Sequence, residues 1–233
     1  MFKRPHHQRI ERVLNSLDGK ALRSHACLFG GGTAMALKFG EFRESVDMDF
    51  MVSDIVHYRA LRQLLTGAEG VQQLLKKPWG PVTQLREVRA DQYGIRTVLA
   101  VDMQPIKFEI ILEARIDLMP SQPSDDICGV PCLTLLDMAA SKLLANSDRW
   151  NDDSVFSRDV IDLAMMKPSQ PLLKAAIQKA QLAYGDAIQN DLSKAISKLK
   201  TRESWLDRCM TAMSMTVPKA LIWQNLKNLQ IDA

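Results

Sequence analysis

The sequence predicts an α+β protein in which a small mixed β-sheet with flanking helices is followed by a helical C-terminal region. Helix-like and strand-like segments alternate up to residue 66, and β-rich runs follow them. Beyond residue 131 nearly every segment repeats apolar residues at helical spacing. With 46% hydrophobic residues among 233, the chain can bury a sizeable core. Strands that precede a run of helices are typical of α+β proteins.

The first half of the chain supplies the predicted sheet. Apolar spacing predicts a helix over 6–24, a strand over 26–29, a helix over 33–39 that stops at Gly40, a strand over 46–52 and a helix over 54–66. Three β-rich runs then cover 82–89, 95–103 and 106–113, with breaks at 91–94 and at Gln104-Pro105. A meander after an αβαβ start favours a mixed sheet over a fully parallel one.

The second half is predicted to be helical. Residues 119–131 are rich in Pro, Ser and Asp, so we place a loop there and divide the chain into domains 1–118 and 119–233. The helices expected beyond it are one that contains Lys142 and is capped by Thr134, one over 155–166, a long one over 171–199 with a break at Gly185, and one after Pro218.

Composition narrows the class of protein. Lys and Arg total 30 against 27 Asp and Glu, a net charge of +3 that is no signature of nucleic-acid binding by itself. The four cysteines lack zinc-ribbon spacing and are expected to be thiols in a reducing cytosol. No segment approaches the roughly 18 uninterrupted apolar residues of a membrane span, and the charged N-terminus lacks a signal-peptide core. We therefore expect a cytoplasmic protein.

Residues 29–50, FGGGTAMALKFGEFRESVDMDF, carry the strongest chemical signal. Glycines let a backbone approach phosphates closely, and a following helix offers free amides to an anion. Asp47 and Asp49 are spaced i, i+2, which places both carboxylates on one face of a strand. Hard cations such as Mg²⁺ are commonly held by one or two carboxylates together with substrate phosphates. The segment predicts nucleotidyl transfer.

The same residues resemble a known family. Gly31-Gly32-Thr33-Ala34 with Arg43, Ser45, Asp47 and Asp49 is similar to the first motif of the AbiEii/AbiGii-type toxins, minimal members of the nucleotidyltransferase superfamily. A second similarity covers 135–144, including Lys142, and then Arg149 and the segment 158–163. The two similarities bracket roughly residues 26–165.

The resemblance implies roles for these residues. Asp47 and Asp49 would hold Mg²⁺ or Mn²⁺, and Lys142 would bind the triphosphate of a nucleoside triphosphate. Asp159 would orient Lys142 or contact the substrate. The other residues expected to bind the nucleotide belong to the first motif: Gly31, Gly32, Thr33, Arg43 and Ser45.

Some assignments stay open at this stage. Glu109 is the best positional match for a third carboxylate that acts as general base, and Asp102 and Glu113 compete with it. Arg43 could instead pair with Glu41 or Glu44, and Ser45 could cap the strand. Arg158 and Asp162 could be salt-bridge partners on one helix. His6 and His7 are expected to form a solvated surface pair.

The expected reaction moves a nucleoside monophosphate from the triphosphate to an acceptor hydroxyl and releases pyrophosphate. The resemblance implies the toxin of a bacterial toxin–antitoxin or abortive-infection system, with RNA (tRNA) or protein as acceptor and a cognate antitoxin as partner. Alternatives are an antibiotic-modifying nucleotidyltransferase and a catalytically degenerate binding protein of the same fold. A solvated lysine face that could also meet RNA comprises Lys174, Lys179, Lys194, Lys198 and Lys200.

Overall fold

The computed structural model describes residues 1–78 and 80–229 and contains two compact units. Unit 1 comprises residues 1–38 and 45–134, and unit 2 comprises residues 39–44 and the chain from 135 onward. The short segment 39–44 therefore belongs to unit 2 although both its neighbours in the chain belong to unit 1. The domain boundary at 118/119 stays a prediction. By their contacts, residues 119–134 belong to unit 1, which contains the strands.

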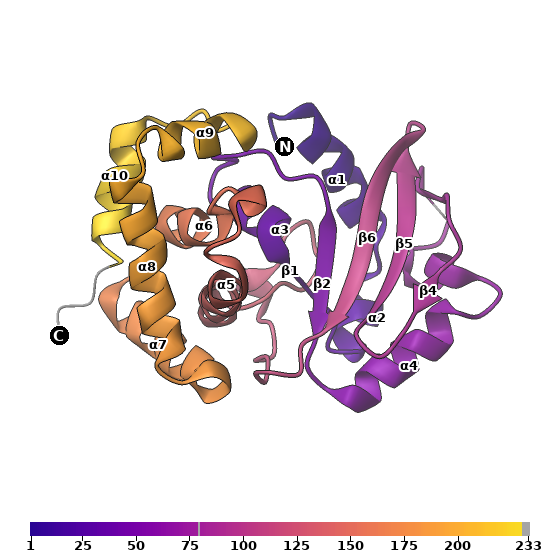
Figure 1. Ribbon diagram of the computed structural model, residues 1–233. Helices are drawn as coiled ribbons and strands as arrows, with labels where there is room; N and C mark the ends of the chain where they lie inside the picture. The colour runs from indigo at the N-terminus through magenta and orange to yellow at the C-terminus, as the bar shows by residue number, and fades with distance from the viewer. Residues whose placement is uncertain (79, 230–233) are drawn as a thin grey trace. The chain divides into compact units, whose positions relative to one another are not determined.

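Unit 1 holds the sheet, whose long strands β5 and β6 lie side by side (Figure 1). Its elements are α1 (Pro5–Ser16), α2 (Gly19–Ser24), β1 (Leu28–Gly30), α3 (Gly31–Lys38), β2 (Met48–Val52), α4 (Ile55–Leu65), β3 (Thr83–Gln84), β4 (Arg89–Ala90), β5 (Gly94–Val101) and β6 (Gln104–Leu112). Short 3-10 turns cover Gly70–Leu74 and Pro123–Asp125.

The sheet is mixed, as predicted. Its strand order is β1-β2-β6-β5-β3, and β4 also pairs with β5. The β2–β6 pair is parallel, whereas the other pairs are antiparallel. A parallel pair needs a long crossover, which the chain between residues 52 and 104 supplies. Of the candidate carboxylates, Asp49 and Glu109 lie on these two parallel strands, whereas Asp47 precedes β2.

One face of the sheet is buried by a row of aromatic rings. Met48, Phe50 and Val52 alternate with more exposed residues along β2, the period of a half-buried strand. Phe50 lies 5.2 Å from Phe29 and 5.1 Å from Phe108, measured between ring centroids. Because neighbouring residues of a strand point to opposite faces, this packing directs Asp49 to the other face of β2.

Three predictions for unit 1 differ from the structure. The break expected at Gln104-Pro105 lies inside β6, because the turn falls at Asp102-Met103. The helix over 6–24 is interrupted, because Leu17 is extended and Asp18 caps a new helix by accepting from the amides of Lys20 and Ala21. The strand over 82–89 is reduced to the two-residue strands β3 and β4. Apolar residues keep their helical spacing across the break at Leu17-Asp18, so periodicity alone did not reveal where the first helix ends.

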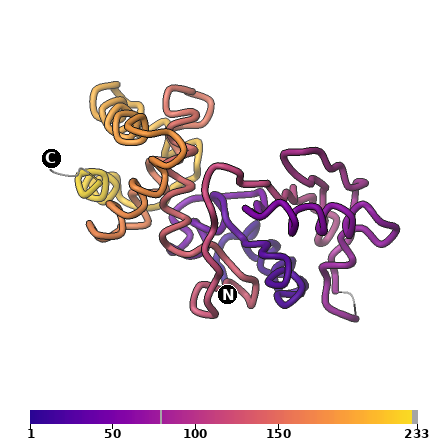
Figure 2. Tube along the Cα trace, turned by 90° about the horizontal axis from the view of Figure 1, so that it is seen from below, coloured from indigo at the N-terminus to yellow at the C-terminus, as the bar shows by residue number. Residues whose placement is uncertain are grey.

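Unit 2 is helical apart from its connections and its 3-10 turn at Asp153–Val155, and its residues 135–229 run from salmon through orange to yellow in Figure 2. Its helices are α5 (Leu135–Arg149), α6 (Arg158–Met166), α7 (Gln170–Tyr184), α8 (Ala187–Thr201), α9 (Trp205–Ala212) and α10 (Lys219–Lys227). The break at Gly185 is confirmed, with a φ of +55° that suits glycine. Helix α9 was not predicted.

Three of the four thiols, Cys27, Cys132 and Cys209, are buried, and none of the four cysteines is in a disulfide within the described residues. Burial raises the pKa of Cys132 to about 12 and of Cys209 to about 11, so both stay protonated at neutral pH. In the part of the chain that the structure describes, no helix is both long and apolar enough to cross a bilayer.

Candidate functional site

On the face of the unit 1 sheet opposite the aromatic rings, a row of residues lies in register across four strands. Gly30 of β1 pairs with Asp49 of β2, Asp49 with Glu109 of β6, and Glu109 with Arg96 of β5. Residues in register on neighbouring strands lie about 5 Å apart along the hydrogen-bonding direction. The register therefore puts Glu109 next to Asp49, in the position expected of a third carboxylate.

Glu109 is held at one end by an ion pair. Arg96 Nε donates to Glu109 Oε1 at 2.6 Å, and Arg96 Nη1 donates to Asp91 Oδ2 at 2.9 Å. The competing carboxylates lie outside the row: Asp102 sits in the β5–β6 turn and pairs with Arg12, and Glu113 follows β6 and pairs with Arg115. Position in the sheet favours Glu109 over both competitors.

The start of α3 lies directly against the Asp49 carboxylate. Strand β1 ends at Gly30 and α3 begins at Gly31, with no loop between them. Gly31 has a φ of +65°, and a Cβ at this position would lie 2.4 Å from Asp49 Oδ2. Only glycine combines this backbone conformation with so close an approach. The close approach to Asp49 thus accounts for glycine at position 31, and contact of Gly31 and Gly32 with a nucleotide stays a prediction.

Asp47 and Ser45 lie in an irregular segment just before β2. The Thr33 hydroxyl, which is buried in α3, donates to the backbone carbonyl of Asp47 and lies 2.8 Å from Ser45 Oγ. Continued one residue back, the alternation of β2 assigns Asp47 to the same side as Asp49. Thr33 therefore fixes the backbone beside the two carboxylates, and this role differs from the predicted bond to the nucleotide.

The donor chemistry suits a hard divalent cation. Asp47 and Asp49 offer carboxylate oxygens, the ligands that Mg²⁺ prefers. Within residues 1–78 and 80–229, no three side chains of Asp, Glu, His or Cys gather as a metal-binding group. Two carboxylates leave most coordination positions to water or substrate phosphates, which is how Mg²⁺ is commonly bound at phosphoryl-transfer sites.

The histidines near the N-terminus are not the surface pair that we expected. His7 is fully buried, and its Nε2 accepts from the amide of Ser45 at 3.2 Å. His6 Nε2 lies 2.9 Å from the carbonyl of Val46, and Arg9 Nη2 lies 3.1 Å from His6 Nδ1. The prediction of a solvated histidine pair was wrong. The local sequence around His7 does not reveal its partner, Ser45, which lies 38 positions further along the chain.

Unit 2 contains a buried network of five charged side chains. Asp162 holds Arg43 through two bonds, of 2.6 and 2.8 Å, and lies 2.6 Å from Lys142 Nζ. Asp159 lies 3.1 Å from the same Nζ and binds Arg149 through bonds of 2.7 and 3.0 Å. Three cations thus share two carboxylates.

Burial and charge act in opposite directions on the two carboxylates. Burial raises the pKa of Asp159, but the charges of Lys142 and Arg149 outweigh it and lower the pKa overall. Burial likewise opposes Arg43 and Lys142 at Asp162, whose pKa is also lowered. Both groups are therefore ionised at neutral pH.

The network revises two interpretations. Arg43, expected to grip phosphate, places its guanidinium on Asp162 and donates from Nη1 to the carbonyl of Glu44. Asp162, considered as a partner on its own helix, instead joins Arg43 to Lys142. The spacing of RDxxD puts Asp159 and Asp162 on one helical face, but it does not name their partners. Nucleotide binding by Arg43 and Lys142 stays a prediction.

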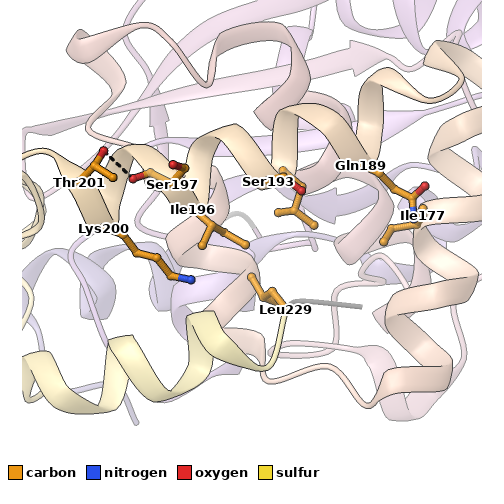
Figure 3. Close-up of a pocket in the computed structure, with 9 residues that line it drawn as sticks. Ile177, Gln189, Ser193, Ile196, Ser197, Lys200, Thr201 and Leu229 are labelled. Atoms are coloured by element: carbon orange, nitrogen blue, oxygen red, sulfur yellow. Dashed lines mark hydrogen bonds between the residues drawn. The ribbon is translucent and has the colours of Figure 1, made fainter. Parts of the chain in front are cut away.

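The predicted lysine face is only partly solvated. Lys179 pairs with the buried Asp137, and Lys198 pairs with Asp153 while its ammonium lies over the ring of Trp205. A hollow of about 360 Å³ is lined by Lys200 and other residues of α8 together with Ile177 of α7 and Leu229 (Figure 3). No residue that we assigned to the active site lines this hollow.

Comparisons with known proteins place these features in a family. A presumed nucleotidyltransferase from H. pylori is similar over 97% of each chain, with 17% identity and a TM-score of 0.44. JHP933 from Helicobacter pylori is similar over 98% of this chain and 95% of its own, with 14% identity and a TM-score of 0.46. No curated protein matches. The model of the nucleotidyl transferase AbiEii toxin family of type IV toxin–antitoxin systems matches residues 12–224, so the chain belongs to this family.

Proposed function

We propose that this protein is a Mg²⁺- or Mn²⁺-dependent nucleotidyltransferase that moves a nucleoside monophosphate from a nucleoside triphosphate to an acceptor hydroxyl. The observation that carries the proposal is the pairing of Asp49 with Glu109 on parallel strands, with Asp47 two residues before and Gly31 against the Asp49 carboxylate. Family membership supports the same chemistry.

In the proposed reaction, the acceptor oxygen forms a bond to the α-phosphorus while the bond from that phosphorus to the bridging oxygen breaks. Glu109 takes the hydroxyl proton, and pyrophosphate leaves. Asp47 and Asp49 would hold the metal, which neutralises charge on the phosphates when bound. The amides of Gly31, Gly32 and Thr33 face the phosphates at the start of α3. Lys142 and Asp159 keep the roles that the resemblance implies.

We further propose that the activity is that of a toxin whose acceptor is RNA (tRNA) or protein, with a cognate antitoxin that counteracts it. The family description supports the toxin and the antitoxin. Among acceptors, a hydroxyl of RNA is the first to test because it needs only an exposed 2′- or 3′-oxygen and no side-chain recognition.

A specific observation favours a second candidate, a catalytically degenerate binding protein. Several side chains assigned to the reaction are engaged within the chain: Glu109 with Arg96, Arg43 with Asp162, and Lys142 with two carboxylates. Such a protein would fold normally but would show neither nucleotide transfer nor Mg²⁺-dependent nucleotide binding.

The deciding experiment incubates the protein with each α-³²P-labelled nucleoside triphosphate, Mg²⁺ and total bacterial RNA. Asp47→Asn and Asp49→Asn should each lower label transfer at least about 100-fold, the scale of losing an electrostatic stabiliser of the transition state. Asp117→Asn, which changes an exposed aspartate of the same unit, is the matched control. Label in protein rather than RNA would change the acceptor, and no transfer together with no Mg²⁺-dependent nucleotide binding would favour the degenerate candidate.

A further inference from the structure

Three consecutive residues before β2 have their backbone groups held by side chains from other elements. The amide of Ser45 donates to His7, and the carbonyl of Val46 lies within hydrogen-bonding distance of His6. The carbonyl of Asp47 accepts from Thr33. Residues 45–47 lie outside any helix or strand, so helical or sheet bonding does not set their conformation.

The two histidines have complementary and well-defined roles. A backbone amide can only donate, so His7 Nε2 must carry a lone pair and not a proton. A carbonyl can only accept, so His6 Nε2 carries its proton, and Nδ1 then accepts from Arg9 Nη2 at 3.1 Å. Both bonds are consistent with neutral rings, and the His7 ring is fully buried.

These contacts come from a part of the chain that the family match does not cover. The match begins at residue 12, whereas His6 and His7 lie in the first turn of α1. Helix α1 therefore adds to the first motif two contacts that the matched residues do not contain.

We propose that His7, assisted by His6, is a positioning residue for the candidate metal site, an inference that rests on the proposed function. His7 fixes the peptide of Ser45, two residues before Asp47, and Thr33 fixes the carbonyl of Asp47 from the other side. Together they set the direction in which the Asp47 carboxylate leaves the backbone. A group that orients a metal ligand typically contributes about 10- to 100-fold to metal affinity or activity.

The test compares His7→Met, which replaces Nε2 with a much weaker thioether acceptor on an unbranched side chain, with His7→Gln, whose amide oxygen can replace Nε2. His25→Met, in the same unit but bound to the carbonyl of Ala21, is the control. Two quantities are measured on the full chain: Mn²⁺ affinity by titration, and hydrogen exchange of the Ser45 amide by NMR.

We expect His7→Met to speed exchange at Ser45 and weaken Mn²⁺ binding about 10-fold or more, and His7→Gln to restore both. His25→Met should leave both unchanged. Faster exchange with wild-type Mn²⁺ affinity would overturn the inference and leave the metal site standing. If wild-type protein binds no Mn²⁺ through Asp47 and Asp49, the proposed function fails, and the inference fails with it.

Discussion

Asp162 is a carboxylate with no solvent access that holds two cations, from Arg43 and Lys142. A buried charge is costly unless its partners remain, and removing one partner leaves the others uncompensated. Replacing the whole network with apolar side chains of similar volume would change the stability little, but removing one charged member is strongly destabilising. We therefore expect stability to fall when Asp162 is replaced and when its charge is removed by acid.

Asp162→Asn should destabilise the protein by about 3–5 kcal/mol, because Arg43 loses its bidentate carboxylate in a site closed to water. The free energy of unfolding measured in urea checks this value. Asp153→Asn is the matched control, since Asp153 also joins two cations, Lys198 and Arg202, but half of its side chain is exposed. A control as destabilised as Asp162→Asn would show that burial is not the cause.

Acid should destabilise the protein through the same carboxylates. The pKa of Asp159 and of Asp162 is lower in the folded chain than the ordinary value of 3.8, so the unfolded chain takes up protons first as pH falls. Their contribution is present above about pH 4 and is lost below it, as the pH falls through the folded pKa values. Urea unfolding at pH 7, 5, 4 and 3 should show this loss, and Asp162→Asn should show less of it.

At the scale of elements, the direct passage from β1 into α3 defines the candidate site. Gly31 carries the positive φ of this junction and lies against Asp49. The structure holds a second glycine of similar conformation in the same unit, Gly129, with a φ of +77° and no atom within 4 Å of its missing Cβ. Comparing alanine substitutions at Gly31 and Gly129 therefore distinguishes the cost of backbone strain from the cost of a steric clash with Asp49.

Gly129→Ala should cost about 1 kcal/mol, the strain of a left-handed conformation alone. Gly31→Ala should cost more and should also weaken Mn²⁺ binding, because its Cβ would displace the Asp49 carboxylate. Thermal unfolding and Mn²⁺ titration of the two variants measure the difference. Equal stability and equal Mn²⁺ affinity in both variants would contradict the close approach seen at Gly31.

Local patterns in the sequence predicted much of this element structure. Alternation over 46–52 predicted β2, which begins at Met48, and the run 106–113 predicted the strand that contains Glu109, although this strand begins at Gln104, where a break was expected. Partners far along the chain were not predicted, such as Asp162 for Arg43 or Ser45 for His7. Periodicity reports which face of an element is apolar, whereas a polar side chain finds its partner only through tertiary packing.

For the whole molecule, the chain passes between its two units at three places, after residues 38, 44 and 134. Two contacts join the segment 39–44 to unit 2: Arg43 pairs with Asp162, and the amide of Glu44 donates to the carbonyl of Met213. The ring of Phe42 in the same segment is buried.

Phe42→Ala should lower the free energy of unfolding by about 3–5 kcal/mol, the usual cost of deleting a buried aromatic ring. Urea unfolding followed by tryptophan fluorescence is a suitable measurement, because Trp150, Trp205 and Trp223 lie in unit 2. Leu182→Ala, at a side chain that is 83% exposed, should change stability little. A small effect of Phe42→Ala would show that the segment is not anchored as described.

The pairing of Arg43 with Asp162 also sets an order of events during synthesis. The two residues are 119 positions apart in the chain. At a translation rate of about 5–20 residues per second, Arg43 waits about 6–24 s before its carboxylate has been polymerised. During that interval the nascent chain carries the first motif, but Arg43 lacks the carboxylate of Asp162. A ribosome-bound chain thus forms this ion pair only after Asp162 of α6 has been made, and the bond from Glu44 to Met213 follows later still.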